Sequence, residues 1–415
     1  MSAYALNEQQ HMLAASARTY LGRRKASVHQ DTPADEQANG AQHWAEMAGL
    51  GWLALPVPEA CGGLGGSMAD ICALAEELGA GLVQEPYIAS AVLAGMLLAE
   101  IAPEAIRQSW LPALADGSQR LALAALEPGA RFDWTEVSTR ATPDGADWQL
   151  DGTKVMVLGG SGAHGLVVSA CISGSSDLAL FLLPTGGPGQ RLVGQNLFDG
   201  QHAAELTMQA ATGAILLLRG DRSVMLDQME RAWDRATLAH CADTVGAMAQ
   251  AFAITREYLG ARSQFGKPIA ANQVVQHRLV DVFIEIEEAR ALMRLSASLF
   301  TDSGEDAAAA QRRHVAATKA FVAQVARHVW EESVQLHGAI GMTQECAVGP
   351  YVKRLALAAS LYGDATFHLQ RLASSALDGT ALASSALDGT ALTALTDQAA
   401  PAATPPKETI SAPSH

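Results

Sequence analysis

The segment Arg262-Ser-Gln-Phe-Gly-Lys-Pro-Ile269 interrupts a long stretch of helical sequence and divides it in two. Pro268 cannot continue the hydrogen bonding of a helix, and Gly266 permits a tight turn. Apolar residues recur at steps of three and four on both sides; they are Leu238, Ala242, Val245, Ala249 and Phe252 before the break, and Val275, Leu279, Val282, Ile286, Ala289 and Met293 after it. Such stripes form the core-facing sides of antiparallel helices. We therefore predict a C-terminal four-helix bundle over residues 222–371.

The sequence before residue 222 divides into two further parts. Residues 1–119 are rich in Ala, Leu and Glu at helical spacing, and a loop rich in Pro and Gly interrupts them at 55–66. Residues 120–218 contain short apolar runs separated by Gly, Asp and Pro, which is typical of a small β-barrel or sandwich. Strands do not alternate with helices there, which argues against a Rossmann fold. The sequence thus predicts an α+β fold with an N-terminal helical domain, a middle β-barrel domain and the C-terminal bundle.

The last segment, residues 372–415, has a composition of its own. The decapeptide LASSALDGTA occupies 372–381 and again 382–391, and an end rich in Pro, Ala and Thr follows. A segment of this composition cannot bury much apolar surface. We expect a solvated, disordered tail.

The overall composition narrows the class of protein. The chain has 415 residues and is 49% apolar, so it can bury a large core. Its net charge of −15 argues against nucleic acid as a partner, because that binding depends on Lys and Arg neutralising phosphates. No apolar run approaches the roughly 18 to 20 residues that span a bilayer, and the five cysteines are scattered without metal-ligand spacing. We expect a cytoplasmic protein without a metal site or a membrane span.

A second segment, Gln335-Leu-His-Gly-Ala-Ile-Gly-Met-Thr343, complements the first. The guanidinium of Arg262 offers a fork of donors to a pyrophosphate, and the ring of Phe265 offers a packing surface to an adenine. Gly338 and Gly341 let backbone N–H groups approach a phosphate closely. In this order and spacing, the two segments closely resemble those of the acyl-CoA dehydrogenase family.

The resemblance covers roughly residues 6–371 and includes two upstream loops, Gly62-Gly-Leu-Gly65 and Leu126-Glu-Pro-Gly129. It implies the family's α–β–α fold and its cofactor, FAD. In that family the two C-terminal segments bind the ADP half of FAD across a dimer interface. The resemblance therefore implies FAD contacts from Arg262, Phe265, Gln335, Gly338 and Gly341.

Three positions that face the flavin ring in the family differ here. Leu126 stands where the family usually has Thr, and Met156 and Leu158 stand in place of its Trp and Thr. A flavin ring placed against these aliphatic side chains would leave acceptors unpaired, at a cost of about 1 to 3 kcal/mol for each one buried. Backbone N–H groups can still supply donors at these positions.

The catalytic base of the family is altered as well. Family members remove a proton α to the thioester carbonyl with a Glu in a Tyr-Glu-Gly-Thr segment, whereas this chain has Leu361-Tyr-Gly-Asp-Ala-Thr366. Either Gly363 or Asp364 falls at the position of the Glu, and Asp364 is the available carboxylate. It is one methylene shorter, and it serves either as the base or as a loop or cap carboxylate. The family's other location for a base aligns with Ala236.

These features lead to three hypotheses. The first is an FAD-dependent acyl-CoA dehydrogenase, or one subunit of a heterotetramer with a homologous subunit, resembling the smaller subunit of bacterial enzymes that act on steroid side chains or dicarboxylyl-CoA. The second is a non-catalytic structural or regulatory partner in such a heterotetramer. The third is an active homotetramer in which the backbone replaces the missing side chains. Under the first hypothesis the substrate is an acyl-CoA, and the resemblance implies an electron-transferring flavoprotein as acceptor.

Overall fold

The structure is a computed structural model that describes residues 5–27, 33–145, 147–301, 304–343 and 345–377. The described residues fall into two units that divide after Leu369. The first unit carries the three parts expected from the sequence, and residues 370–377 of the second continue its last helix. The first residues of the repeat, 372–377, form the end of a helix, so the tail expected from residue 372 is not disordered there; the rest of the repeat and tail, from residue 378 on, lies outside the described residues.

The N-terminal part is helical, as expected. Its elements are α1 (Glu8–Ser27), α2 (Pro33–Gly49), α3 (Met68–Ala80), a π-helical segment (Ile88–Gly95) that continues as α4 (Met96–Ile101), and α5 (Glu104–Ala115). The Pro/Gly loop ends at Ser67, whose side chain and that of Asp70 form a reciprocal capping box at the start of α3.

The middle part is an eight-stranded sheet. Its strands are β1 (Leu121–Ala124), β2 (Arg140–Asp144), β3 (Asp147–Leu158), β4 (Gly165–Ile172), β5 (Leu178–Pro184), β6 (Gln190–Asn196), β7 (His202–Ala211) and β8 (Ile215–Gly220). They lie in the order β6-β7-β3-β2-β4-β5-β8, with β1 pairing in parallel with the first half of β4. This order ends at β6 on one side and at β8 on the other. Among the described residues, the β domain expected as a barrel is therefore a sheet with two edge strands.

The C-terminal part is a helical bundle, as the apolar stripes predict. It contains α6 (Arg222–Ala261), α7 (Gln273–Ser298), α8 (Glu305–His337), α9 (Gly349–Ala358) and α10 (Ala365–Leu377). The break at Arg262–Ile269 forms a small hairpin of β9 (Ser263–Gln264) and β10 (Lys267–Pro268), which separates α6 from α7. Helix α10 ends at Leu377, whereas the bundle was expected to end at residue 371.

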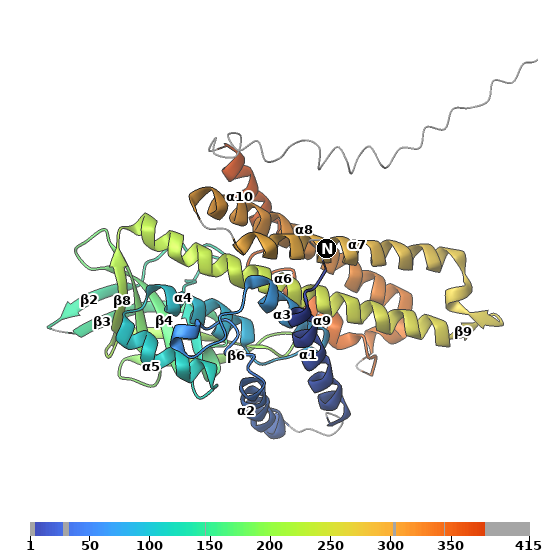
Figure 1. The fold of residues 1–415 in the computed structure, drawn as a ribbon, viewed down its shortest axis with the longest axis horizontal. Coiled ribbons are helices and arrows are strands. Elements are labelled where there is room, and N and C mark those ends of the chain that lie inside the picture. Colours follow the sequence, from blue (N-terminus) through green and yellow to red (C-terminus); the bar gives the residue numbers. More distant parts are fainter. Residues whose placement is uncertain (1–4, 28–32, 146, 302–303, 344, 378–415) are drawn as a thin grey trace, which may run out of the picture. The chain divides into compact units, whose positions relative to one another are not determined.

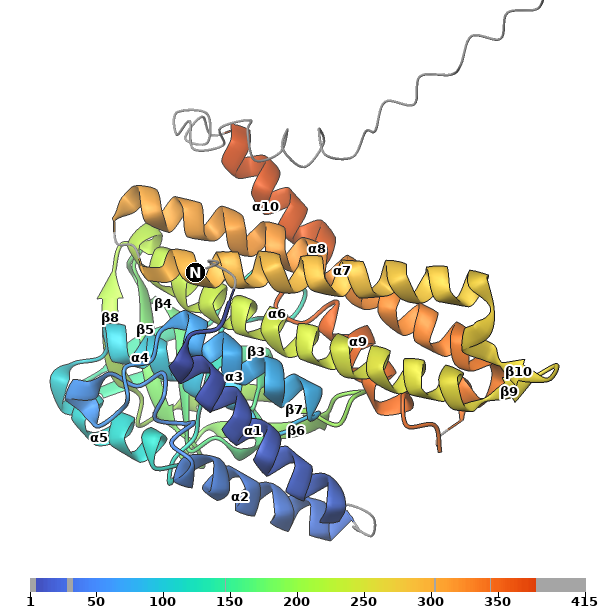
Figure 2. The same cartoon turned by 45° about the vertical axis from the view of Figure 1, so that its right-hand side comes forward.

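Helix α6 connects the two ends of the first unit. Its N-terminal end follows β8, and its C-terminal end leads into the hairpin at the far end of the bundle (Figure 1, Figure 2). Two glycines let α3 cross it closely: a Cβ on Gly79 would lie 1.9 Å from the carbonyl oxygen of Asp243, and one on Gly246 would lie 1.7 Å from that of Glu76. The N-terminal part and the bundle therefore share one core at this crossing. Within the part of the chain that is described, every helix is too short or too polar to span a bilayer.

Candidate cofactor and active site

The first candidate segment lies at the hairpin end of α6. Arg262 follows the last residue of the helix, and its carbonyl oxygen accepts a hydrogen bond from Ile269 N–H at 2.9 Å, which closes the hairpin. Its side chain is exposed, and no carboxylate among the described residues forms an ion pair with it. Phe265, at the tip of the hairpin, has φ +52° and a fully exposed ring. A guanidinium and an aromatic ring thus project from the same turn.

The second segment lies beside the first. Helix α8 ends at His337, whose ring stacks on Tyr258 of α6 with centroids 4.5 Å apart. Gln335 and Gly338 are exposed there, and Gly338 has φ +66° at the helix end. Gly341 is buried in the turn that follows, where a Cβ would come within 3.0 Å of the carbonyl oxygen of Val334. The structure therefore places the two segments at one end of the bundle.

The three positions expected at the flavin ring lie at the opposite end of α6, next to the sheet. Leu126 is buried, its carbonyl oxygen accepts from Val155 N–H at 2.9 Å, and the half-buried Leu158 packs against the same apolar core. Met156 differs from these two: its φ is +50°, it lies at an irregularity in the pairing of β3 with β7, and its side chain is 37% exposed. None of these three side chains offers a hydrogen-bond donor.

A buried ion pair holds the loop at residues 126–129 against the sheet. The sequence alone does not reveal this pair. Lys154 Nζ lies 2.7 Å from Glu127 Oε1 and 3.0 Å from Ser169 Oγ. Glu127 also accepts hydrogen bonds from the backbone N–H and hydroxyl groups of Ser138 and Thr139. Burial alone would raise the pKa of Glu127, but Lys154 and these bonds lower it to about 2. Burial lowers the pKa of Lys154 to about 8 in spite of its partner. The sequence shows Glu127 in Glu-Pro-Gly and Lys154 in Gly-Thr-Lys, but the spacing of these motifs does not predict that the two side chains form an ion pair.

The loop between α9 and α10 contains the candidate base. Gly363 has φ +101°, and a Cβ there would lie 2.5 Å from Phe367 and 2.7 Å from His368, so no side chain fits at this position. Asp364 is therefore the carboxylate of this loop. Its Oδ1 accepts a hydrogen bond from Phe367 N–H at 2.8 Å, which is the geometry of a helix cap. The cap is one of the two roles that the sequence leaves open, and it leaves the second carboxylate oxygen available.

Two buried basic side chains hold the start of this loop. Lys319 Nζ donates to the carbonyl oxygen of Ala358 at 2.6 Å, and Nε2 of His240 lies 3.2 Å from the same oxygen. Burial lowers the pKa of Lys319 to about 8 and that of His240 well below its usual value. His240 is thus a neutral core residue. Lys319 shows no sequence signal beyond its place on an apolar helix.

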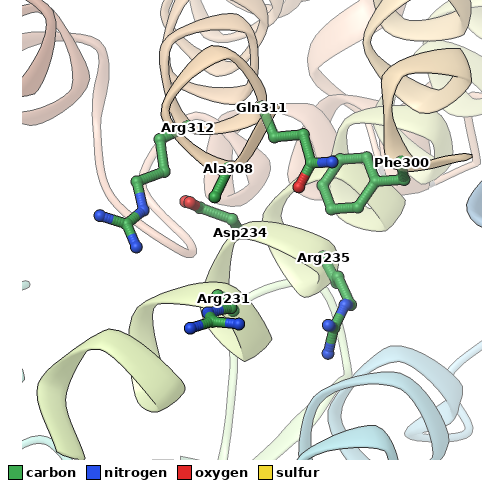
Figure 3. Close-up of a pocket in the computed structure, with 7 residues that line it drawn as sticks. All are labelled: Arg231, Asp234, Arg235, Phe300, Ala308, Gln311 and Arg312. Atoms are coloured by element: carbon green, nitrogen blue, oxygen red, sulfur yellow. The ribbon is translucent and has the colours of Figure 1, made fainter. Parts of the chain in front are cut away.

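A small pocket lies between α6 and α8, beside the short helical turn Leu299–Thr301 (Figure 3). Its lining includes Arg231, Arg235 and Arg312. Each of these arginines already has a carboxylate partner: Asp227 for Arg231, Glu100 for Arg235, and both Asp227 and Glu230 for Arg312. The pocket therefore offers little uncompensated positive charge to a phosphate.

The fold and the bundle end together define a class of protein. It is an α–β–α protein whose bundle end presents an exposed arginine, an exposed phenylalanine and glycine turns. Models of the acyl-CoA dehydrogenase N-terminal and C-terminal domains match residues 7–118 and 226–377. The chain belongs to the acyl-CoA dehydrogenase family.

Known proteins similar to this chain include enzymes and two-chain complexes. Acyl-CoA dehydrogenase FadE12 of Mycobacterium tuberculosis is 28% identical over 341 residues, covering 80% of this chain and 85% of that protein. The solved structure of the Tcur3481–Tcur3483 steroid ACAD is 30% identical with a TM-score of 0.78, and covers 90% of this chain and 99% of that one. The ChsE4–ChsE5 complex from Mycobacterium tuberculosis shares the fold at 23% identity with a TM-score of 0.76, covering 89% of this chain and 98% of that one.

Proposed function

We propose that this chain is one subunit of a heteromeric, FAD-dependent acyl-CoA dehydrogenase, and that it holds the ADP half of a flavin whose ring lies in a neighbouring subunit. The observation that carries the proposal is the separation of the two candidate half-sites along α6. Leu126 shares a core cluster with Trp233, near the start of α6, whereas Arg262 follows its end. At 1.5 Å per residue, the stretch from Trp233 to Arg262 measures about 40 Å.

A single dinucleotide cannot bridge that distance within one chain. The groups at the two ends would therefore contact two different flavins, and each flavin would be shared between two chains. An interface of this kind explains why Phe265 is fully exposed in the isolated chain, since an aromatic ring is otherwise a core or interface residue.

The residues present fit the ADP half of FAD better than its ring. At the bundle end, Arg262 has a free guanidinium for a pyrophosphate, Phe265 has a free ring face, and Gly338 exposes backbone. At the sheet end, Leu126 and Leu158 bury aliphatic groups where ring nitrogens and carbonyls need partners. When bound, FAD supplies the acceptor for the hydride that leaves the β-carbon of the acyl-CoA.

This chain's own contribution to the proton transfer would come from Asp364. A general base must reach the α-proton of the substrate, and Asp364 is one methylene shorter than the family's Glu and is held at the N-terminus of α10 by one of its oxygens. We therefore place the catalytic base of the complex on the homologous subunit. The Tcur3481–Tcur3483 steroid ACAD, at 30% identity, supports a complex of two different chains.

The proposal also covers the substrate, the electron acceptor and the cellular compartment. The substrate is an acyl-CoA thioester and the electron acceptor is an electron-transferring flavoprotein, as the resemblance implies. The five cysteines are all unpaired, which fits a reducing compartment such as the cytoplasm.

Asp364→Asn tests the division of labour, since it keeps the shape of the side chain but removes a proton acceptor. In a complex with a homologous subunit that has the usual Thr, Trp and Glu, acyl-CoA oxidation should fall by no more than a few-fold. Asp221→Asn is a matched control, because Asp221 caps the start of α6 by accepting from Ser223 N–H. A loss beyond about 10²-fold for Asp364→Asn alone, with flavin and assembly intact, would make Asp364 the base.

Flavin content separates the proposal from an active homotetramer. Expressed alone, the chain should retain little FAD, and the heterotetramer should hold about half of its possible flavins. An active homotetramer with FAD bound in every subunit would contradict the proposal. It would favour the hypothesis of a homotetramer in which the backbone replaces the missing side chains.

A further inference from the structure

Five aromatic side chains gather beside Asp364. The ring of Trp134 stacks on that of Trp233 with centroids 4.8 Å apart and planes at 21°. Tyr362 lies edge-on to Trp233 at 5.9 Å, Phe367 lies edge-on to Trp134 at 5.9 Å, and Phe132 lies 5.8 Å from Phe367. They come from the β1–β2 connection, from α6 and from the loop and helix that follow α9.

The cluster packs Tyr362 and Phe367, on either side of Asp364 in the chain, against Trp233 of α6 and Trp134 of the β1–β2 connection. Tyr362 precedes Gly363 and Asp364 in the chain, and Phe367 donates its backbone N–H to the Asp364 carboxylate. Trp134, Trp233 and Tyr362 are all less than 10% exposed, and they share one core cluster with Leu126 and Ala236. An acyl group with its α-carbon at Asp364 and its β-carbon at a ring near Leu126 would have to enter this cluster.

Trp233 contributes bulk to the stack rather than a hydrogen bond. The indole N–H of Trp233 is buried without an acceptor among the described residues, although a buried indole N–H usually has one. The same holds for Trp52 in another core cluster, so the place of Trp233 against Tyr362, beside the Asp364 loop, carries the inference rather than the unpaired donor alone.

We infer that the stacked pair Trp134–Trp233 is a plug that fills the acyl side of this chain's own site, and that Trp233 decides whether an acyl group can enter. The inference rests on the proposed function, because it assumes that Asp364 and Leu126 mark the place of the reaction. It means that the two kinds of subunit in the complex are unequal: this one excludes the acyl group, and its homologue admits it.

The test compares octanoyl-CoA with free CoA on the full-length chain by isothermal titration calorimetry. The wild type should bind the two with dissociation constants within about 3-fold of each other, or bind neither, because the acyl chain gains no apolar contact. Trp233→Ala should favour octanoyl-CoA over CoA by at least about 10-fold, because the removed indole leaves an apolar cavity. Trp134→Ala should act in the same direction from the other side of the stack.

Trp148→Ala is the matched control. Trp148 lies on β3 and packs edge-on against Phe181 at 5.3 Å, in a different core cluster. Its removal should leave the ratio of the two affinities unchanged. If neither plug variant folds, the wild-type ratio still decides.

A wild-type preference for octanoyl-CoA of about 10-fold or more would overturn the plug. So would a folded Trp233→Ala chain without any gain in preference. Neither result touches the proposed function, which depends on flavin retention through Arg262 and on turnover of the complex. Conversely, a complex without flavin or turnover would overturn that function whatever the ratio.

Discussion

The two ends of α6 differ in whether their polar side chains are exposed or buried. At the hairpin end, Arg262, Phe265 and Gln335 are exposed, and the guanidinium has no ion-pair partner among the described residues. At the sheet end, Glu127 and Lys154 are buried with every charge paired, and apolar side chains surround them. Side chains that serve a neighbour's ligand must remain available in the isolated chain, whereas side chains that only hold the fold can satisfy one another. The difference is what the proposed sharing of a flavin between two chains requires.

The sheet end should therefore respond to mutation through stability, with the largest effect in the molecule. Glu127→Ala leaves the Lys154 ammonium buried without its counter-ion and should lower the free energy of unfolding by about 3 to 5 kcal/mol, measured by urea denaturation. The double variant Glu127→Ala/Lys154→Met should recover much of this loss, because no charge is then left unpaired.

The exposed pair Arg327 and Glu331 provides the control for that prediction. Arg327→Ala breaks an exposed ion pair on α8 and should lower the free energy of unfolding far less than Glu127→Ala does. Equal losses in the two single variants would contradict a special role for the buried pair.

The hairpin end should respond through binding instead. Arg262→Ala should weaken FAD retention in the heteromeric complex by about 1.5 to 3 kcal/mol, or roughly 10- to 100-fold, because it removes charge-assisted bonds to a pyrophosphate. Melting temperature should hardly change, since the side chain is exposed. Arg262→Lys should rescue only part of the loss, because a point charge does not replace a planar fork.

Flavin fluorescence released on dilution measures this retention. Arg191→Ala, which removes another exposed arginine on the strand β6, should leave it unchanged. Flavin occupancy equal to wild type in Arg262→Ala would remove Arg262 from the site.

The hairpin end could be predicted from the sequence, and the reason is local. Gly266 and Pro268 break the helix whatever the rest of the chain does, and the segments at 262–269 and 335–343 carry their chemistry in consecutive residues. Their proximity follows from antiparallel helices of similar length. The order of the helical, β and helical parts can also be predicted from local sequence, because each part has its own hydrophobic periodicity.

The sheet end could be predicted only in part, because its contacts join distant segments. Met156 and Leu158 are two residues apart, so an unbroken strand would place both on one face. The irregularity between Lys154 and Val157 changes this, and Met156 is more exposed than Leu158 as a result. The pairing of Lys154 with Glu127 and the stack of Trp134 on Trp233 depend on strand register and helix packing, which single-chain periodicity does not specify.

The interior near Asp364 should also give stability a pH dependence, which is the smallest effect expected. Lys319 has a pKa of about 8 in the folded chain, lowered from 10.5 mainly by burial. Between these two values the unfolded chain binds more protons at this group than the folded chain, so its contribution to stability rises with pH. Relative to Lys319→Met, the wild type should gain about 1 kcal/mol in the free energy of unfolding from pH 8 to pH 9, measured by urea denaturation at each pH.

The comparison between variants matters here because other buried groups titrate nearby in pH. Burial lowers the pKa of Lys154 to about 8 and raises that of the Cys241 thiol to about 12, and these two shifts act on stability in opposite directions as pH rises. Both groups remain in Lys319→Met. Lys319 lowers the pKa of the Cys241 thiol, but between pH 8 and pH 9 that buried thiol stays protonated in the folded chain with or without the ammonium, so the difference reports Lys319. Lys353→Met, which removes an exposed ammonium on α9, should run parallel to the wild type over the same range. If Lys319→Met also runs parallel to the wild type, the ammonium that holds Ala358 is better solvated than its burial indicates, and the loop before Asp364 is correspondingly more open than the closed interior described here.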